Sequence, residues 1–155
     1  MTSRSTHAHE RNTYSTVSGG IGKTRILVIE DDLALQIILI SILRRVSENI
    51  EIAWTDTAEK AFIKVKEKHY DLVIADIFLK GRTTGIEFWQ VMEIERPEIP
   101  LVVMSGLPYN EFLIAIGRNN IAPPFLSKPL NPGEAVQILK GILISSQRYA
   151  FLTAL

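Results

Sequence analysis

The stretch Arg25-Ile-Leu-Val-Ile-Glu-Asp-Asp32 decides the fold, because it joins an apolar run to three consecutive carboxylates. The run 25–29 is apolar throughout after its first residue, as expected of a strand buried on both faces of a sheet. The apolar segment 33–46 that follows is too long for a strand and predicts a helix. The stretch therefore predicts a strand–helix unit with acidic groups between its two elements.

The rest of the chain repeats this alternation of strand and helix. Further strands are predicted at 50–54, 71–75, 100–105 and 123–127, and further helices at 57–69, 85–95, 110–118 and 131–145. Such an alternation predicts an α/β fold with one doubly wound, five-stranded parallel sheet and helices on both faces. Five strands suit the flavodoxin-like order 2-1-3-4-5, in which ligands bind beyond the carboxyl ends of strands one and three.

The residues just before the first strand, SGGIGKT at 18–24, resemble a phosphate-binding P-loop. The consensus GxxxxGK[ST] needs glycine where this chain has Val17, and it must follow a strand and open a helix. Here a strand follows, so no helix N-terminus is available to bind phosphate. We interpret the segment as a glycine-rich linker that ends a flexible N-terminal tail, residues 1–23, in which His7 and His9 are expected to be solvated.

Composition limits the functions that the chain can have. Its 155 residues, of which 46% are hydrophobic, suffice for one domain, predicted at 24–146 with 147–155 as an apolar C-terminal extension of the last helix. The 17 basic residues balance the 17 acidic ones, which favours neither nucleic acid nor an anionic membrane as a partner. No signal peptide or membrane span is predicted, and the lack of cysteine excludes disulfides and thiolate metal sites. We therefore expect a cytoplasmic protein.

Carboxylates gather where strands end. Glu30 and Asp31 follow the first strand and Asp76 ends the third, and these strands are neighbours in the predicted order. Three carboxylates in one crevice would repel one another, and Mg²⁺ is the hard cation best suited to neutralise them. The alternative interpretation is that Asp31 or Asp32 only caps the following helix and that Asp76 is a loop residue.

Two further strand ends carry polar side chains to the same edge of the sheet. Ser105 ends the fourth strand in VVMSG, and Lys128 follows the fifth strand in FLSKP. With the carboxylates, every strand except the second then contributes a polar group there.

From about Arg25 to Ser145 the chain resembles a response-regulator receiver domain. RILVIEDD is similar to the acidic cluster after the first strand of that family, and ADIFL to the segment around its phosphorylated aspartate. VVMSG is similar to the end of its fourth strand, and SKP to its Lys-Pro motif, whose peptide bond is typically cis. The four motifs occur in the family's order and at its approximate spacings.

The resemblance implies a role for each residue of the cluster. Asp76 would accept a phosphoryl group, while Ser105 and Lys128 would each bind a phosphoryl oxygen. Mg²⁺ would be held by four groups: the carboxylates of Glu30, Asp31 and Asp76, and the backbone carbonyl of Phe78.

The resemblance also assigns a switch. Phe125, three residues before Lys128, corresponds to the family's switch aromatic, which would turn inward when Ser105 moves toward the phosphoryl group. The alternative is that Phe125 is an ordinary core residue.

Three positions depart from the family pattern or refine it. Lys80 replaces a proline that usually lies four residues after the acceptor, and it or Arg82 either reaches the phosphoryl group or a partner or is a solvated loop charge. Phe78 and Leu107 flank the path of the hydrolytic water, and neither side chain can orient water. We therefore expect a long-lived acyl phosphate.

The helix predicted at 33–46 has two apolar stripes. One, Leu35, Ile38, Leu39, Ile42 and Val46, is expected to face the core. The other, Leu33, Ile37 and Ile40, is expected to be partly exposed and to dock a helix of a histidine kinase or phosphotransfer protein; the alternative is a broader core face.

The resemblance implies a signalling switch of a two-component system or phosphorelay rather than an enzyme with a separate substrate. It would catalyse only its own phosphorylation by a histidine kinase or phosphotransfer protein and a slow autodephosphorylation. Its output would pass through protein contacts or self-dimerisation on the face from the fourth strand to the last helix. One alternative is a pseudo-receiver that binds partners without phosphorylation. Another is an aspartate-nucleophile phosphohydrolase, against which Phe78 argues because those enzymes carry an acid at that position.

Overall fold

A single five-stranded parallel sheet organises the computed structural model, which describes residues 22–117 and 120–155. The strands are β1 (Thr24–Ile29), β2 (Ile50–Thr55), β3 (Leu72–Asp76), β4 (Leu101–Ser105) and β5 (Phe125–Ser127). Their order in the sheet is β2-β1-β3-β4-β5, which confirms the predicted topology. The order reverses between β1 and β3, whose residues Ile29 and Ala75 are paired near the carboxyl ends of the strands.

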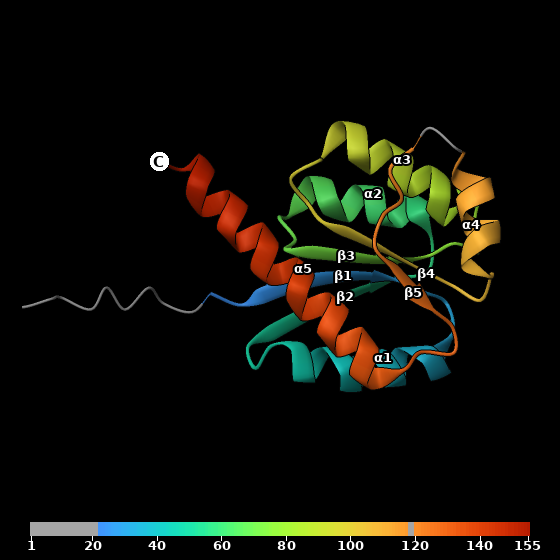
Figure 1. Cartoon of the computed structure of the whole chain (residues 1–155), viewed down its shortest axis with the longest axis horizontal. Coiled ribbons are helices and arrows are strands. Elements are labelled where there is room, and N and C mark those ends of the chain that lie inside the picture. The colour runs from blue at the N-terminus through green and yellow to red at the C-terminus, as the bar shows by residue number, and fades with distance from the viewer. Residues whose placement is uncertain (1–21, 118–119) are drawn as a thin grey trace, which may run out of the picture.

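Helices cover both faces of this sheet (Figure 1). They are α1 (Leu33–Val46), α2 (Ala58–Glu67), α3 (Gly85–Glu95), α4 (Tyr109–Ile116) and α5 (Pro132–Thr153). Buried side chains of α1 and α5 pack on one face, and those of α2, α3 and α4 pack on the other. This two-faced covering is what the predicted doubly wound class requires.

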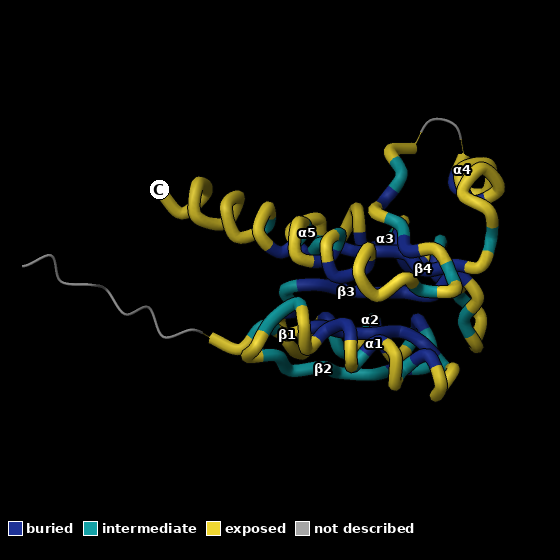
Figure 2. Tube along the Cα trace, turned by 60° about the horizontal axis from the view of Figure 1, so that its bottom comes forward, coloured by how far each residue is buried: buried dark blue, intermediate teal, exposed yellow. Residues whose placement is uncertain are grey.

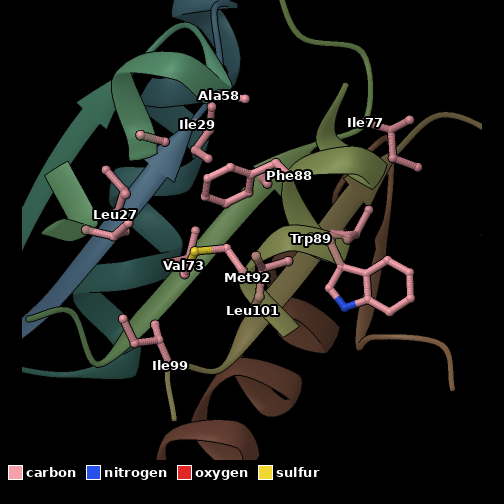
Figure 3. Packing of buried hydrophobic residues seen from close by; sticks show 14 of the residues in the cluster. Leu27, Ile29, Ala58, Val73, Ile77, Phe88, Trp89, Met92, Ile99 and Leu101 are labelled. Atoms are coloured by element: carbon pink, nitrogen blue, oxygen red, sulfur yellow. The ribbon is translucent and has the colours of Figure 1, made fainter. Parts of the chain in front are cut away.

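The strand β1 shows why its sequence is apolar without alternation. Leu27 and Ile29 point into the core beneath α2 and α3, whereas Ile26 and Val28 point into the core beneath α1 and α5. Figure 3 shows Leu27 and Ile29 on the first of these faces, close to Phe88 of α3. Each of the four strand residues is fully buried, so a polar substitution at any of them would lack a solvated face.

Side-chain caps mark where four of the five described helices begin, α4 being the exception. Asp32 caps α1 through hydrogen bonds from the N–H groups of Ala34 and Leu35. Thr84 and Glu87 form a reciprocal capping box at α3, and Asn131 caps α5. The helix-cap alternative for the first acidic cluster therefore holds for Asp32.

The apolar surface of α1 differs from prediction at one position. Ile38, expected in the core stripe, is 44% exposed, and Leu43 is buried in its place. The reason is that the buried stripe of α1 consists of residues 35, 39, 42 and 43, to which position 38 is only peripheral. Leu33 and Ile37, predicted to be partly exposed, are 73% and 71% exposed, and Ile40 is half-buried.

The two ends of the chain leave the sheet in different ways. The predicted N-terminal tail, including His7 and His9, lies outside the described residues up to position 21. β1 begins at Thr24, so a strand directly follows the glycine-rich segment, as the argument against a P-loop requires. α5 continues to Thr153, and its last turns extend away from the sheet with all of residues 147–153 exposed (Figures 1 and 2). Within the described ranges, no helix has the length and apolar character needed to cross a membrane.

Candidate functional site

Three carboxylates meet at the point where the strand order reverses. Glu30 follows β1 and Asp76 ends β3, and Asp31 is the residue after Glu30. One ligand oxygen from each of the three lies within 4.8 Å of the others. Glu30 is 1% exposed and Asp76 is 5% exposed, so two of the three charges are held out of water. The predicted convergence of these residues is confirmed.

Lys128 lies between the two buried carboxylates. Its Nζ is 2.9 Å from Glu30 Oε2 and 2.8 Å from Asp76 Oδ2. The residue follows the short strand β5, its backbone N–H donates to the Ser105 carbonyl, and its peptide bond to Pro129 is cis, as the family motif predicts. A single ammonium group thus joins the ends of β1, β3 and β5.

The pKa values in this cluster reflect competition between burial and pairing. Burial raises the pKa of the Glu30 carboxyl above its ordinary value, and the hydrogen bonds from the Asp32 N–H and Lys128 offset this only in part. Burial alone would lower the pKa of Lys128, but its hydrogen bonds to Asp76 and Glu30 outweigh burial and raise that pKa. The cluster therefore retains a firmly bound cation next to a carboxyl that resists ionisation.

Both oxygens of Asp76 are oriented by hydrogen bonds. Oδ2 accepts from Lys128, and Oδ1 accepts from the backbone N–H of Phe78 at 3.2 Å. Each carboxylate oxygen has two lone pairs, so each keeps one for a further partner. The side chain is thus held in one orientation while its oxygens can still bind a cation or attack an electrophile.

Asp31 lies on the outer side of the cluster and has a cation of its own. Lys80 Nζ is 3.3 Å from Asp31 Oδ2, and the two side chains are 70% and 24% exposed. The sequence placed Lys80 in the loop after β3 but left open whether it reaches the phosphoryl group or only solvent. The structure gives it a different contact, a carboxylate of the acidic cluster.

Ser105 and Phe125 lie on the β4–β5 side of the site. Ser105 is fully buried at the end of β4, and its Oγ accepts a hydrogen bond from the Leu107 N–H. Phe125 is half-buried, with its ring centroid 4.8 Å from that of Phe112 and 5.4 Å from that of Tyr109, both on α4. A rotation of Phe125 would therefore disturb the packing of α4, which is the contact that a switch aromatic needs.

Two apolar residues, Phe78 and Leu107, lie two positions after Asp76 and Ser105 in the chain. Phe78 is 63% exposed just after Asp76, and Leu107 is half-buried just after Ser105. Neither can donate or accept a hydrogen bond through its side chain. The effect of these two residues on hydrolysis stays a prediction.

Two contacts at the site were missed in the sequence. Glu59 of α2 holds the loop after β3, because its Oε1 accepts hydrogen bonds from the N–H groups of Arg82 and Thr83. Tyr109 adds a second α4 ring to Phe125. The first contact joins residues 23 or 24 positions apart, and no local sequence pattern predicts it. The second could have been predicted, because the spacing of Tyr109 and Phe112 places two aromatic residues on one helix face.

A hollow in the described part of the surface lies away from this cluster. A groove of about 700 Å³ runs between the second half of α5 and the residues that precede β3 and β4, among them Tyr70 and Pro100. It lies at the amino ends of the strands, opposite the acidic cluster.

The chemistry available at the cluster follows from its donors. Three carboxylates with converging oxygens at a partly solvated sheet edge suit a hard divalent cation that keeps some of its water. A buried carboxylate next to an ammonium group suits attack on, or binding of, a phosphoryl group. The residues present therefore fit both a magnesium ion and phosphoryl transfer.

Comparison with known proteins points to one family. A family model described as the response regulator receiver domain matches residues 26–140. The chain is 28% identical over 133 residues to the transcriptional regulatory protein ResD of Bacillus subtilis, which covers 85% of this chain and 53% of ResD. It is 28% identical over 119 residues to the nitrogen assimilation regulatory protein NtrX of Azorhizobium caulinodans, with 76% of this chain and 26% of NtrX covered. The chain thus spans about half or less of these relatives.

Solved structures share the fold. NtrX from Brucella abortus superposes with a TM-score of 0.72 at 24% identity, covering 86% of this chain and 29% of that one. A response regulator receiver protein from Sinorhizobium medicae superposes with a TM-score of 0.68 at 21% identity, covering 80% and 97%. At these identities the structural similarity establishes the architecture alone, and the chemistry of the site follows from its own residues.

Proposed function

The chain belongs to the response regulator receiver family, and from that membership we propose that it is a phosphorylation-dependent switch whose acceptor is Asp76. The observation that carries the proposal is the position of Asp76, buried at the reversal point with Lys128 Nζ 2.8 Å from its Oδ2. The proposed switch comprises residues 24–146, with 147–155 as an apolar extension of its last helix.

The proposed reaction moves a phosphoryl group from a phosphohistidine to Asp76. A carboxylate oxygen of Asp76 forms a bond to phosphorus, the phosphorus–nitrogen bond breaks, and the imidazole leaves and takes up a proton. Lys128 neutralises one phosphoryl oxygen, and the Ser105 hydroxyl donates a hydrogen bond to another. Because positioning and charge neutralisation account for most of the catalysis of phosphoryl transfer, these few groups suffice.

The divalent cation of the proposal is Mg²⁺, held by Glu30, Asp31, Asp76 and the backbone carbonyl of Phe78. When bound, it supplies positive charge that offsets the charge on the phosphoryl oxygens. Glu30 is fixed for this role by the hydrogen bond that its Oε1 accepts from the Asp32 N–H. The cluster of three converging carboxylate oxygens supports the assignment.

The proposed donor is a histidine kinase or a phosphotransfer protein, docked on the exposed apolar residues of α1. Leu33 and Ile37 support this surface by their exposure. The output runs through the face from β4 to α5, to a downstream protein or a second copy, because Phe125 couples the end of the sheet to α4. The protein is proposed to act in the cytoplasm, without nucleic acid or membrane as a direct partner, and to catalyse only its own phosphorylation and slow dephosphorylation.

The test is an intact-mass measurement after incubation with Mg²⁺ and acetyl phosphate. We expect one added phosphoryl group on the parent protein, none on Asp76→Asn, and one on the matched control Asp71→Asn, whose partly exposed carboxylate precedes β3 at the opposite edge of the sheet. A phosphorylated phosphotransfer protein serves as a second donor. If both donors leave the parent unmodified, the proposal fails and a non-phosphorylated binding module replaces it.

A further inference from the structure

Two cations, not one, contact the three carboxylates of the cluster. Lys128 pairs with Glu30 and Asp76 on the buried side, and Lys80 pairs with Asp31 on the exposed side. The second pair involves an oxygen of a residue that also belongs to the converging set of possible metal ligands. Lys80 therefore neutralises part of the negative charge that would attract a divalent cation to the cluster.

The backbone around Lys80 is held in place on both sides of the residue. Lys80 itself forms a β-bridge with Thr57, just before α2. Gly81 follows with φ of +99°, a backbone conformation that favours glycine, and a Cβ there would displace the Glu59 carboxylate, whose Oε2 would lie 2.6 Å away. The Glu59 carboxylate then accepts hydrogen bonds of 3.0 and 2.9 Å from the next two backbone N–H groups.

This anchoring separates the fixed and movable parts of Lys80. The main chain is tied to the start of α2, so it delivers the side chain to the edge of the acidic cluster. The ammonium group itself is 70% exposed; it forms a 3.3 Å ion pair with Asp31 and also attracts the Asp56 carboxylate. An exposed pair of this kind breaks at little cost in free energy, so the ammonium group can leave while its backbone stays.

We propose that Lys80 is an internal competitor of the divalent cation at Asp31, which lowers the affinity of the cluster for Mg²⁺. This inference rests on the proposed function, because it takes the cluster to be the metal site. Binding of the cation displaces the Lys80 ammonium group from Asp31 Oδ2 and leaves two like charges close together. The lost ion pair and the added repulsion both oppose metal binding, and salt screens both.

Lys80 acts on the metal site through its charge, and it does not contact the acceptor Asp76. Lys128 cannot be the same kind of competitor, because its two carboxylate partners are buried and its own side chain is only 23% exposed. Arg82 offers a matched comparison in the same loop, since what the structure ties to Glu59 is its backbone N–H. A difference between the two loop cations would therefore isolate the contact with Asp31.

The experiment is a titration of the whole chain with Mg²⁺ alone by isothermal calorimetry at low ionic strength, repeated with Mn²⁺ by electron paramagnetic resonance. We expect Lys80→Met to lower the Mg²⁺ dissociation constant roughly three- to tenfold. Lys80→Arg keeps the charge and should stay within about twofold of the parent, as should Arg82→Met. The gain from Lys80→Met should shrink when the titration is repeated in high salt. Urea unfolding of each variant verifies that the fold is intact.

Three other outcomes would count against the inference. An equal dissociation constant for Lys80→Met and Arg82→Met overturns it, and if Asp76 is still phosphorylated the proposed function stands. A gain that is the same in Lys80→Arg also overturns it, because shape rather than charge would then be responsible. If neither the parent nor any variant binds Mg²⁺ or Mn²⁺, the metal assignment fails together with the inference.

Discussion

The acidic site has an inner and an outer half that use the same chemistry under different conditions. In the inner half, Glu30 and Asp76 share the Lys128 ammonium group at 2.9 and 2.8 Å. In the outer half, Lys80 Nζ lies 3.3 Å from Asp31 Oδ2. The inner carboxylates are 1% and 8% exposed at the side chain, whereas Lys80 is 70% exposed. Both halves pair lysine with carboxylate, and burial is the main difference.

Burial makes the inner half hard to break and the outer half easy to exchange. A buried charge that loses its partner keeps its desolvation cost, while an exposed one is simply resolvated. The inner half therefore suits a permanent role, which is to hold Asp76 in one orientation. The outer half suits a role in which a cation enters and leaves. The inner and outer halves should therefore respond differently to substitution.

The largest effect is expected from Lys128→Met. The substitution leaves Glu30 and Asp76 close together and without their cation, so the free energy of unfolding at pH 7 should fall by about 3 kcal/mol. Urea unfolding in the presence of a chelator measures this. The loss should shrink as the pH falls, because the buried Glu30 carboxyl, whose pKa burial raises, then takes up a proton. A loss below 1 kcal/mol would mean that the inner half behaves like a surface pair.

In the parent protein, the stabilisation that Lys128 gives the folded state depends on pH in its own range. Its pKa is raised above 10.5 in the folded state, so the stabilisation is complete below the pKa of the unfolded chain. It is then lost as the pH rises through the raised folded value. As the pH is raised above 10.5, unfolding midpoints should therefore fall more steeply in the parent than in Lys128→Met.

The second prediction concerns Glu30, the carboxyl whose pKa burial raises above 4.5. Between 4.5 and the raised value, the folded protein keeps a proton that the unfolded chain has lost, so parent stability falls as the pH rises through that window. Glu30→Gln lacks this titration. Its unfolding free energy relative to the parent should therefore increase between pH 4.5 and pH 7, by about 1.4 kcal/mol for each unit of pKa displacement.

Carbon-detected nuclear magnetic resonance gives an independent reading of the same group. The Glu30 carboxyl resonance should titrate with a midpoint above 4.5 when a chelator is present. A midpoint at or below that value would show that Lys128 outweighs burial, and the inner half would then be dominated by pairing.

Much of the inner half could be predicted from the sequence, for a physical reason. Glu30, Asp76 and Lys128 each lie at a strand end, and parallel strands deliver their carboxyl ends to one edge of the sheet. The apolar runs before them identify those strands without knowledge of the tertiary structure. The same rule located Ser105 at the end of β4.

The contact between Lys80 and Asp31 in the outer half could not be predicted from the sequence, because it depends on the path of a loop. Lys80 reaches Asp31 only because Gly81 adopts a positive φ and the turn is fixed by Glu59, far away in the sequence. No periodicity encodes such contacts. Similarly, Ile38 was expected in the core from its helical spacing, but the buried stripe of α1 passes beside it.

The third prediction concerns the apolar rim, which belongs to neither half. Phe78 is 63% exposed beside Asp76 and offers no hydrogen bond to water. We expect the phosphorylated parent to persist for hours, and Phe78→Asn to shorten its half-life about tenfold, which corresponds to about 1.4 kcal/mol of barrier. Loss of the added mass over time measures both rates. Ile94→Asn, at an exposed apolar residue of α3, is the matched control and should leave the rate unchanged.

A parent half-life of seconds would contradict this prediction, because water would then be oriented without help from either apolar residue. An unchanged rate in Phe78→Asn would move the control of water to Leu107 or to the bound cation.

The smallest effect is expected from Lys80→Met, measured as stability. The Lys80–Asp31 pair is exposed on the lysine side, so its removal should change the free energy of unfolding by at most about 0.5 kcal/mol in a chelator. Any change should vanish at 1 M salt, where screening acts within about 3 Å. Lys80→Met should therefore destabilise the protein severalfold less than Lys128→Met, although both replace a lysine of the same acidic site with methionine. A loss of 2 kcal/mol or more would show that Lys80 holds the loop after β3 in place, and the outer half would be a structural contact and not an exchangeable one.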